Sequence, residues 1–518
     1  RKAFEKIGHL YPKVKDADGK EHTVIAWLWA RTVKCPNPAC GCEMPLASSF
    51  ELSKKKGKEV YTDPIINNGH ISYAVKQGKQ DEGTVNRRGA TCICCGAAVG
   101  FPYIRDEGRS GRMGRHLLAV VAEGQGGRVY LSAGSEQIEI ADVGRPEAYP
   151  DADLPNNPRD FKTPNYGMTT FAELFTNRQL LALMTFSELV GEVRTQVKSD
   201  GGSAEYAQAV SVYLAFVVDK MTDYHSSVCS WHSSRDLIRN TFGRQAIPMI
   251  WDYAEANPFC ASSGSYDNML GWVVKSIGTL PATSCGVVAQ FDAQSDYGLQ
   301  NIMISTDPPY YDNISYADLS DFFYVWMRQS LKDIYPALFR TMLVPKAEEL
   351  VATPYRFGGS TENAKSFFED GMSSACRQMY AAAVDDVPVT IYYAFKQRDT
   401  DTQDATASTG WETMLSAIIR AGFCITGTWP MRTERAGRTL SIGANALASS
   451  IVLVCRKRPA DAPVATRRDF LTALKRELRP ALVNLQQSNI APVDMEQSAI
   501  GPGMAVYSRY AQVLEADG

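Results

Sequence analysis

Two groups of cysteines, far apart in the chain, constrain its fold most strongly. The first is Cys35-Pro-Asn-Pro-Ala-Cys40-Gly-Cys42, and the second is Cys92-Ile-Cys94-Cys95-Gly96. Close cysteine pairs followed by glycine are typical of knuckles that hold structural zinc in a tetrahedral thiolate site. The spacing predicts four zinc ligands and leaves Cys42 and Cys94 as further candidates. The predicted ligands are Cys35, Cys40, Cys92 and Cys95. A set of buried free thiols is the alternative.

The charge of the chain is unevenly distributed. The formal net charge of the 518 residues is −3, yet residues 1–115 hold 20 Lys and Arg against 12 Asp and Glu. A basic module on an acidic body suggests where a polyanion would bind. Side chains that could contact phosphates are the lysines of residues 54–58 and, after the second knuckle, Arg105, Arg109, Arg112 and Arg115. A solvated basic surface is the alternative.

The composition favours a chain that works away from membranes. No apolar run reaches the ~20 residues that a membrane-spanning helix needs. Cysteines spaced for metal rather than for disulfides are typical of a reducing compartment. We therefore expect a cytoplasmic protein with no membrane partner.

A second constraining feature is a polar loop after an expected strand. Residues 301–305 read as the strand, and Asp307-Pro308-Pro309-Tyr310 follows it. Open α/β sheets place their sites in loops at the carboxyl ends of strands. Prolines donate no backbone hydrogen bond, so the carbonyls of this loop are expected to stay free. A carboxylate, free carbonyls and an aromatic ring can accept an amino group and stack on a base. A simple proline turn is the alternative.

Hydrophobic periodicity predicts the other elements. Thr176 is expected to cap a helix, and Glu255 is assigned only a structural role. A Pro/Asp/Asn-rich stretch at 144–165 reads as a linker. Strands are expected at 22–34, 117–122, 129–131, 287–291, 388–395, 423–429 and 449–455, and helices at 180–190, 203–224, 234–256, 316–328, 411–421 and 467–482.

The predicted fold class is α/β, with five segments along the chain. They are a zinc-ribbon and basic module with flanking strands (1–143), a linker (144–165), a mainly helical region (166–282), an α/β core that carries the Asp307 loop (283–458) and a helical tail (459–518).

The motifs together resemble a known family. Asp307-Pro-Pro-Tyr310 matches the catalytic motif of amino-group DNA methyltransferases that use S-adenosylmethionine, and an acidic first position is typical of N6-adenine enzymes. Two further segments carry the likeness: Trp27-Leu-Trp-Ala-Arg-Thr-Val-Lys-Cys35-Pro-Asn-Pro-Ala-Cys40 and Tyr316-Ala-Asp-Leu-Ser-Asp-Phe-Phe-Tyr324. Over nearly its whole length the chain resembles the zinc-ribbon-containing adenine-specific DNA methylases of bacteria and archaea. The resemblance implies a Rossmann-like methyltransferase sheet with an inserted zinc ribbon.

The resemblance also implies roles for residues of the loop. The Asp307 carboxylate and the Pro308 carbonyl would accept hydrogen bonds from the adenine amine, within a turn that Pro309 makes rigid. Tyr310 would stack on the base after it leaves the duplex. Further substrate-binding residues would be Tyr311, Asn313 and Tyr316.

Cofactor contacts are implied at two other places. Asp292 and Ala293 would contact the adenine end of S-adenosylmethionine, and Phe175 and Thr176 would hold its methionine end. Asn177 departs from the proline that usually follows this Phe-Thr pair. The family's Gly-rich Asp-Pro-Phe-x-Gly-x-Gly loop does not occur in residues 1–518. We therefore expect that residues before Arg1 or a partner chain supply it.

The implied function is methyl transfer to the N6 amine of adenine in double-stranded DNA, with S-adenosylmethionine as cofactor and zinc in a structural role. Other subunits of a restriction-modification or phage-defence system are implied partners. Two alternatives stay open: an RNA base methyltransferase, and a non-catalytic DNA-binding subunit that needs a partner for the cofactor loop.

Overall fold

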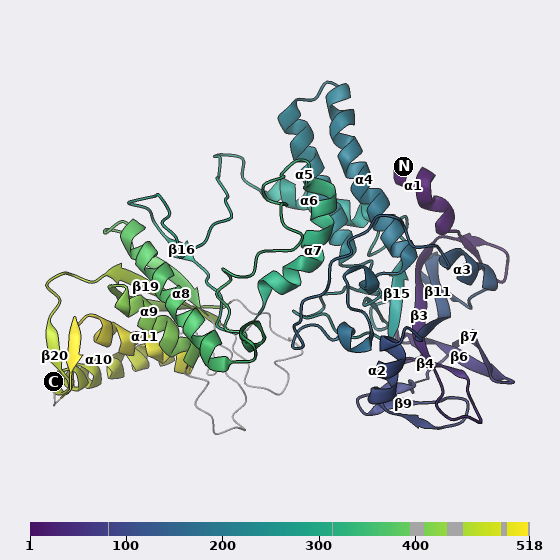
Figure 1. The fold of residues 1–518 in the computed structure, drawn as a ribbon, viewed down its shortest axis with the longest axis horizontal. Helices are drawn as coiled ribbons and strands as arrows, with labels where there is room; N and C mark the ends of the chain where they lie inside the picture. The colour runs from purple at the N-terminus through teal and green to yellow at the C-terminus, as the bar shows by residue number, and fades with distance from the viewer. Residues whose placement is uncertain (81, 313, 394–408, 433–448, 488–494, 516–518) are drawn as a thin grey trace. The chain divides into compact units, whose positions relative to one another are not determined.

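The computed structural model describes residues 1–80, 82–312, 314–393, 409–432, 449–487 and 495–515 (Figure 1). The chain divides into two compact units. Unit 1 comprises 1–285 and 316–346, and unit 2 comprises 286–315 and 347–518. Both units contain helices and strands, so the expected α/β class is confirmed in its broad form. None of the helices in these ranges has the length and apolar character to cross a bilayer.

An antiparallel sheet around strand β3 (Val24–Lys34) is the core of unit 1. Strand β3 pairs with β11 (Gly114–Gly124) on one side and with β15 (Asp252–Ala256) on the other. Strand β12 (Gly127–Leu131) extends the sheet beyond β11, and β4 (Glu43–Leu46) pairs with the end of β3. Both faces of β3 are covered, so its side chains are buried almost throughout. The strands expected at 22–34, 117–122 and 129–131 are thus confirmed.

Four longer helices belong to unit 1. Helices α4 (Asn177–Ser199) and α5 (Ala204–Thr222) form an antiparallel pair (Figure 1). Helices α6 (Tyr266–Thr279) and α7 (Tyr316–Leu331) pack against α5. The helices expected at 180–190, 203–224 and 316–328 are confirmed. Within the segment predicted as a linker, Phe161 is fully buried and Thr163–Tyr166 forms a short 3-10 helix.

The helix expected at 234–256 is wrong. The structure has strands β14 (Leu237–Arg239) and β15 there instead, and β14 pairs with β13 (Ser230–His232) just before this segment. Alanine and glutamate near the end of this segment favour a helix by intrinsic propensity. Pairing with β3 overrides that preference, because it satisfies the backbone of β15 and buries Tyr253 and Ala254 in the sheet.

A four-stranded sheet is the core of unit 2. Its strand order is β16-β17-β19-β18, where β16 (Ser305–Thr306) and β17 (Val389–Tyr393) are parallel and β19 (Ser449–Lys457) and β18 (Phe423–Arg432) add antiparallel pairs. The parallel pairing spans two residue pairs, whereas both antiparallel pairings are longer. Helices α8 (Thr361–Ala382) and α9 (Thr409–Arg420) supply Phe368, Met372, Trp411 and Met414 to the core of this sheet.

The rest of unit 2 differs from expectation at two strands. The strand expected at 301–305 is shorter and shifted, because β16 comprises only Ser305–Thr306, and Ile302 forms an isolated bridge with Ala383. Helices α10 (Arg467–Gln487) and α11 (Met495–Ser508) form the C-terminal part, and α11 packs on β18. The expected strand 287–291 is wrong, because this segment pairs with no other described strand and Val287 is 97% exposed. Extended propensity alone does not make a strand when no neighbour pairs with it.

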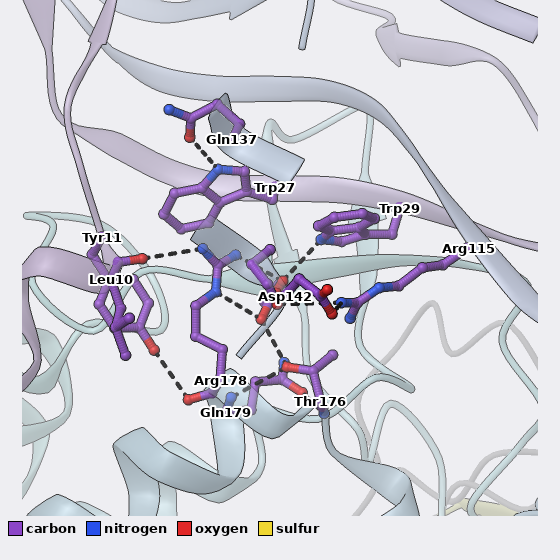
Figure 2. A network of polar contacts seen from close by, with 12 residues as sticks. Leu10, Tyr11, Trp27, Trp29, Arg115, Gln137, Asp142, Thr176, Arg178 and Gln179 are labelled. Carbon is purple, nitrogen blue, oxygen red and sulfur yellow. Dashed lines mark hydrogen bonds and ion pairs between the residues drawn. The ribbon is translucent and has the colours of Figure 1, made fainter. Parts of the chain in front are cut away.

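A buried ion pair connects the elements of unit 1. The Arg178 guanidinium donates from Nε and Nη2 to the two oxygens of Glu255, at 3.1 and 2.8 Å. Trp29 Nε1 donates to Glu255 Oε2 at 2.8 Å, and the Thr176 hydroxyl donates to Oε1 at 2.7 Å. Arg178 Nη1 reaches the Leu10 carbonyl at 3.1 Å (Figure 2). Every strong acceptor site of this carboxylate is therefore used.

The network keeps both charges in the protein interior. Arg178 is 0% exposed and Glu255 is 1% exposed. Burial opposes the charge on Glu255, but the ion pair with Arg178 outweighs it and holds the pKa of Glu255 below its ordinary value. The guanidinium also lies over the Trp27 ring, 4.1 Å from its centroid. The pair thus fixes β15 and β3 against the first turn of α4.

Arg178→Met is expected to lower the free energy of unfolding of unit 1 by about 3–5 kcal/mol, because it leaves Glu255 buried and unpaired. Urea unfolding followed by tryptophan fluorescence measures the loss. The double variant Arg178→Met/Glu255→Gln should recover part of it, since no unpaired charge remains. As a control, Lys2→Met breaks an exposed pair with Glu192 and should leave the unfolding midpoint unchanged. An equal midpoint for the wild type and Arg178→Met would contradict the assigned role of the pair.

Candidate functional site

The four predicted zinc ligands come together in unit 1. The sulfurs of Cys35, Cys40, Cys92 and Cys95 all lie within 4.8 Å of one another. Cys35 and Cys95 are 3.7 Å apart, and Cys40 and Cys92 are 3.9 Å apart. A tetrahedral zinc–thiolate site with Zn–S bonds of about 2.3 Å places its sulfurs about 3.8 Å apart. The four thiols therefore fit a zinc ion in number, type and spacing.

Two tight turns bring the ligands together. In the first, Cys40 N and Gly41 N donate to the Asn37 carbonyl, and Gly41 has a φ of +58°. In the second, Gly96 N donates to the Cys92 carbonyl, and Gly96 has a φ of +74°. Only glycine adopts this left-handed backbone without strain. Each turn therefore requires the glycine that follows its cysteine pair, because the backbone is left-handed at that position.

The cluster lies against an apolar core that limits access of water. Val33, Met44 and Ile104 belong to the same group of buried side chains as Cys35 and Cys92. Burial raises the pKa of the Cys35 thiol to about 12. Asn37 Nδ2 lies 3.8 Å from the Cys95 sulfur, where it can donate to a thiolate. Such outer contacts orient the ligands of a metal site.

The structure divides the basic side chains near the cluster into two groups. Arg112 donates to Glu107 at 2.8 Å, and Arg115 lies over the Trp29 ring at 4.9 Å. Arg105 and Arg109 are exposed on helix α2 (Phe101–Arg109). Exposed arginines also stand at 87 and 88, in the turn between β8 (Val85–Asn86) and β9 (Gly89–Thr91). This Arg-Arg pair was not predicted as a phosphate contact, although its position just before the second knuckle could have indicated that role.

The Asp307 loop directly follows β16 in unit 2. The Tyr310 hydroxyl donates to Asp307 Oδ1 at 2.6 Å, while the Asp307 residue is exposed. The Tyr310 ring packs edge-on against Tyr393, which is fully buried and donates to the Gly410 carbonyl. The loop therefore presents a carboxylate that a ring packed on the core holds in place.

The other predicted substrate residues have different surroundings. Tyr311, next in the chain, has a φ of +53° and packs edge-on against Phe368 of α8. Asn313 lies outside the described residues. Tyr316 belongs to unit 1, at the start of α7, and is 53% exposed. Two acidic residues later in α7 form polar contacts within unit 1. Asp318 accepts a hydrogen bond from Asn157, and Asp321 forms an ion pair with Lys346.

The predicted cofactor residues also fall in both units. In unit 2, Asp292 Oδ1 accepts from Gln294 N at 3.0 Å, and the Ala293 carbonyl accepts from Tyr297. In unit 1, the Thr176 hydroxyl both binds Glu255 and accepts from Gln179 N, which confirms the predicted cap of α4.

The Phe175 side chain is buried next to this cap. Its ring stacks on Phe322 and meets Trp326 edge-on. Phe175 and Thr176 therefore fix the start of α4.

A polar pocket of about 280 Å³ opens beside this helix start, and sequence reasoning missed it. Arg31, Arg145, Gly167, Phe175 and Asn177 are among its lining residues. Glu173 lines it too, but its carboxylate accepts from the backbone of residues 169 and 170.

Arg31 is the half-buried cation of this pocket, and Arg145, which also lines it, is exposed. It donates to the Ile250 carbonyl and to Ser227, which are neutral oxygens. Burial lowers the pKa of Arg31. Within the described ranges, no carboxylate forms an ion pair with Arg31. A guanidinium without an anionic partner favours binding of an oxyanion.

Comparisons with protein-family models, with curated proteins and with solved structures find no match for this chain.

Cys95→Ser is expected to lower the zinc content of the purified chain and the midpoint of its thermal unfolding, because structural zinc contributes directly to folding. Residue Cys95 is exposed, so serine leaves no cavity and the loss reports the metal. Zinc is measured by elemental analysis and unfolding by circular dichroism. The matched control is Cys285→Ser, another exposed cysteine, which should change neither value. Zinc content equal to that of the wild type in Cys95→Ser would exclude Cys95 as a ligand.

Proposed function

We propose that the chain is a DNA methyltransferase that transfers a methyl group from S-adenosylmethionine to the N6 amine of adenine. The observation that carries the proposal is the Asp307-Pro308-Pro309-Tyr310 loop directly after β16, at the carboxyl end of a parallel strand pair. Loops at this position are where open α/β sheets bind their ligands. The strand order of unit 2 is compatible with the later part of a Rossmann-like sheet.

The chemistry of the loop suits an aromatic amine. The lone pair of the adenine amine is delocalised into the ring, so the amine is a poor nucleophile. Hydrogen bonds from its two N–H groups to the Asp307 carboxylate and the Pro308 carbonyl would localise that lone pair. Asp307 keeps acceptor capacity for this task, because a carboxylate offers about four acceptor sites and the Tyr310 hydroxyl uses one. Tyr310 would thus orient the carboxylate as well as stack on a flipped base.

A basic module accompanies the loop in the same chain and supports a nucleic acid substrate, for which we propose duplex DNA. Exposed arginines come before the second cysteine turn, at 87 and 88, and after it, at Arg105 and Arg109 on α2. Contacts of this kind bind phosphates and position nucleic acid without reading its sequence. We propose a cytoplasmic role, in a restriction-modification or phage-defence system with further subunits.

We assign the cofactor's amino acid end to the pocket beside α4. Arg31 offers a cation without an anionic partner in the described residues, and the pocket adjoins Phe175 and Asn177. S-adenosylmethionine, when bound, supplies the electrophilic methyl group. Arg31 would bind its carboxylate.

A second candidate is a DNA-binding subunit that does not bind cofactor by itself. Two observations favour it. The side chains of Phe175 and Thr176 are already engaged in the packing of unit 1, and the Gly-rich cofactor loop does not occur in the 518 residues. An RNA base methyltransferase remains the third candidate, because its target amine would meet the same loop.

Asp307→Ala should lower methyl transfer to duplex DNA by at least about 100-fold, because one preorganised polar contact to the reacting group is lost. Zinc content and thermal unfolding should persist, since the residue is exposed. Transfer of labelled methyl groups to duplex DNA, and in parallel to tRNA and rRNA, measures the activity. Asp461→Ala removes another exposed acid of unit 2 and should keep full activity. Undiminished transfer by Asp307→Ala would refute the proposal, and transfer to RNA alone would favour the third candidate.

Calorimetry should detect saturable binding of S-adenosylmethionine. 5′-Methylthioadenosine, which lacks the amino acid carboxylate, should bind at least about 10-fold more weakly, because it forms no charge-assisted hydrogen bond with Arg31. Equal affinity for the two compounds would exclude a carboxylate contact at Arg31. No binding of either would favour the non-catalytic subunit.

A further inference from the structure

A β-hairpin lies in the chain between the two cysteine turns, and the proposed reaction assigns it no role. Strands β6 (Val60–Asn67) and β7 (His70–Gln77) pair over eight residue pairs (Figure 1). Asn68 and Gly69 connect them with φ values of +50° and +81°, as in a type I′ turn. A turn of this type matches the twist of the two strands, so the tip of the hairpin has a defined geometry.

The inner half of the hairpin is fixed to unit 1. The Thr62 hydroxyl donates to the Leu118 carbonyl at 2.9 Å, and Val75 N donates to the Ser132 hydroxyl at 2.9 Å. The Tyr73 side chain packs against a small buried cluster that includes Leu118. These contacts hold the base of the hairpin on the central sheet, so the outer half extends from a rigid support.

The outer half of the hairpin, residues 65–72, is mostly exposed and carries no formal charge. Ile65 and Ile66 are 37% and 41% exposed, and Asn67 and His70 beside the turn are exposed as well. Edge strands that stand free in water usually carry charged side chains, which prevent pairing with other chains. An uncharged tip with adjacent exposed isoleucines therefore favours contact with a partner.

The charge of this segment is concentrated at the base of the hairpin. Residues 54–80 contain six lysines and two acidic residues. Four of the lysines form ion pairs with nearby carboxylates, whereas Lys56 and Lys58 are exposed and form no ion pair with any residue that the structure describes. A cationic base below an uncharged tip suits a partner with phosphates on its outside and neutral hydrogen-bonding groups in a groove. Duplex DNA has this arrangement.

We propose that the tip of this hairpin enters the major groove of DNA and reads its sequence, an inference that rests on the proposed function. The major groove, about 12 Å wide, admits a two-stranded ribbon, whereas the minor groove is only about 6 Å wide. The Asn67 amide would accept a hydrogen bond from the N6 amine of an adenine and donate one to its N7, and Ile66 would contact a thymine methyl group. Lys56 and Lys58 would bind phosphates at the edge of the groove.

Selection of bound sequences from a randomised pool of short duplexes measures what the full-length chain reads. The wild type should enrich one motif. Asn67→Ala should lower the preference for adenine at one position of that motif by about 10-fold, because the paired hydrogen bonds to that base are lost. Asn268→Ala removes an exposed asparagine of α6 and should keep the full motif. Asn68 is left unchanged, because the turn needs its left-handed backbone.

The salt dependence of duplex affinity tests the base of the hairpin. Fluorescence anisotropy follows binding of the same randomised pool at several salt concentrations. Lys56→Ala should weaken binding of all sequences alike and reduce the slope of log affinity against log salt concentration by about 1, because one phosphate contact is lost. Lys275→Ala, which removes an exposed lysine of α6, should leave the slope unchanged.

The outcomes distinguish this inference from the proposed reaction. A motif that Asn67→Ala does not change, or a wild type that enriches no motif, would overturn the role of the tip and point to a protein partner instead. An unchanged slope in Lys56→Ala would exclude the phosphate contact at the base. Neither assay contains S-adenosylmethionine, so a chain that selects a motif but transfers no methyl group would refute the reaction and leave the role of the hairpin intact.

Discussion

The ion pair between Arg178 and Glu255 is the interaction on which unit 1 depends, because neither charge is stable in the protein interior without the other. It joins β15 to α4, and the indole of Trp29 brings β3 into the same network. Thr176 binds the same carboxylate while it caps α4. The pocket that contains Arg31 therefore opens beside a helix start with a fixed position. Sites built on such rigid elements hold their geometry better than sites on loops.

The cysteine cluster stabilises the part of unit 1 that the sheet does not. The strands between and around the two turns are short, two or three residues each in β8, β9 and β10 (Ala98–Val99). Strands of this length bury little apolar surface, so a metal ion bound by the cysteines would supply much of their stability. The exposed arginines of α2 and of the β8–β9 turn lie next to these cysteines in the chain. Loss of a metal ion from the cluster would therefore also disturb the proposed phosphate-binding surface.

The sequence predicted features that depend on local spacing. The convergence of four cysteines, β3, the cap at Thr176 and helices α4, α5 and α7 follow from residue type and periodicity, whereas α6 was not predicted. Features that depend on distant partners were missed. Glu255 lies 77 residues from Arg178, and Arg31 lies 219 residues from the Ile250 carbonyl that it binds. Strand β15 was predicted as helix because its Ala and Glu residues prefer that state, and only pairing with β3 reverses the preference. No local pattern encodes such contacts.

The proposed reaction has two requirements, acceptance of the target amine and binding of the cofactor, and the residues predicted for them are divided between the two units. Asp307, Tyr310 and the predicted adenine-end contact Asp292 belong to unit 2, whereas Arg31, Phe175 and the zinc cluster belong to unit 1. In the proposed reaction, the loop and its packing on Tyr393 and α8 would accept the target amine. The pocket beside α4 would bind the cofactor's carboxylate. The two proposed contacts depend on different residues, so the loss of one can be measured while the residues of the other stay intact.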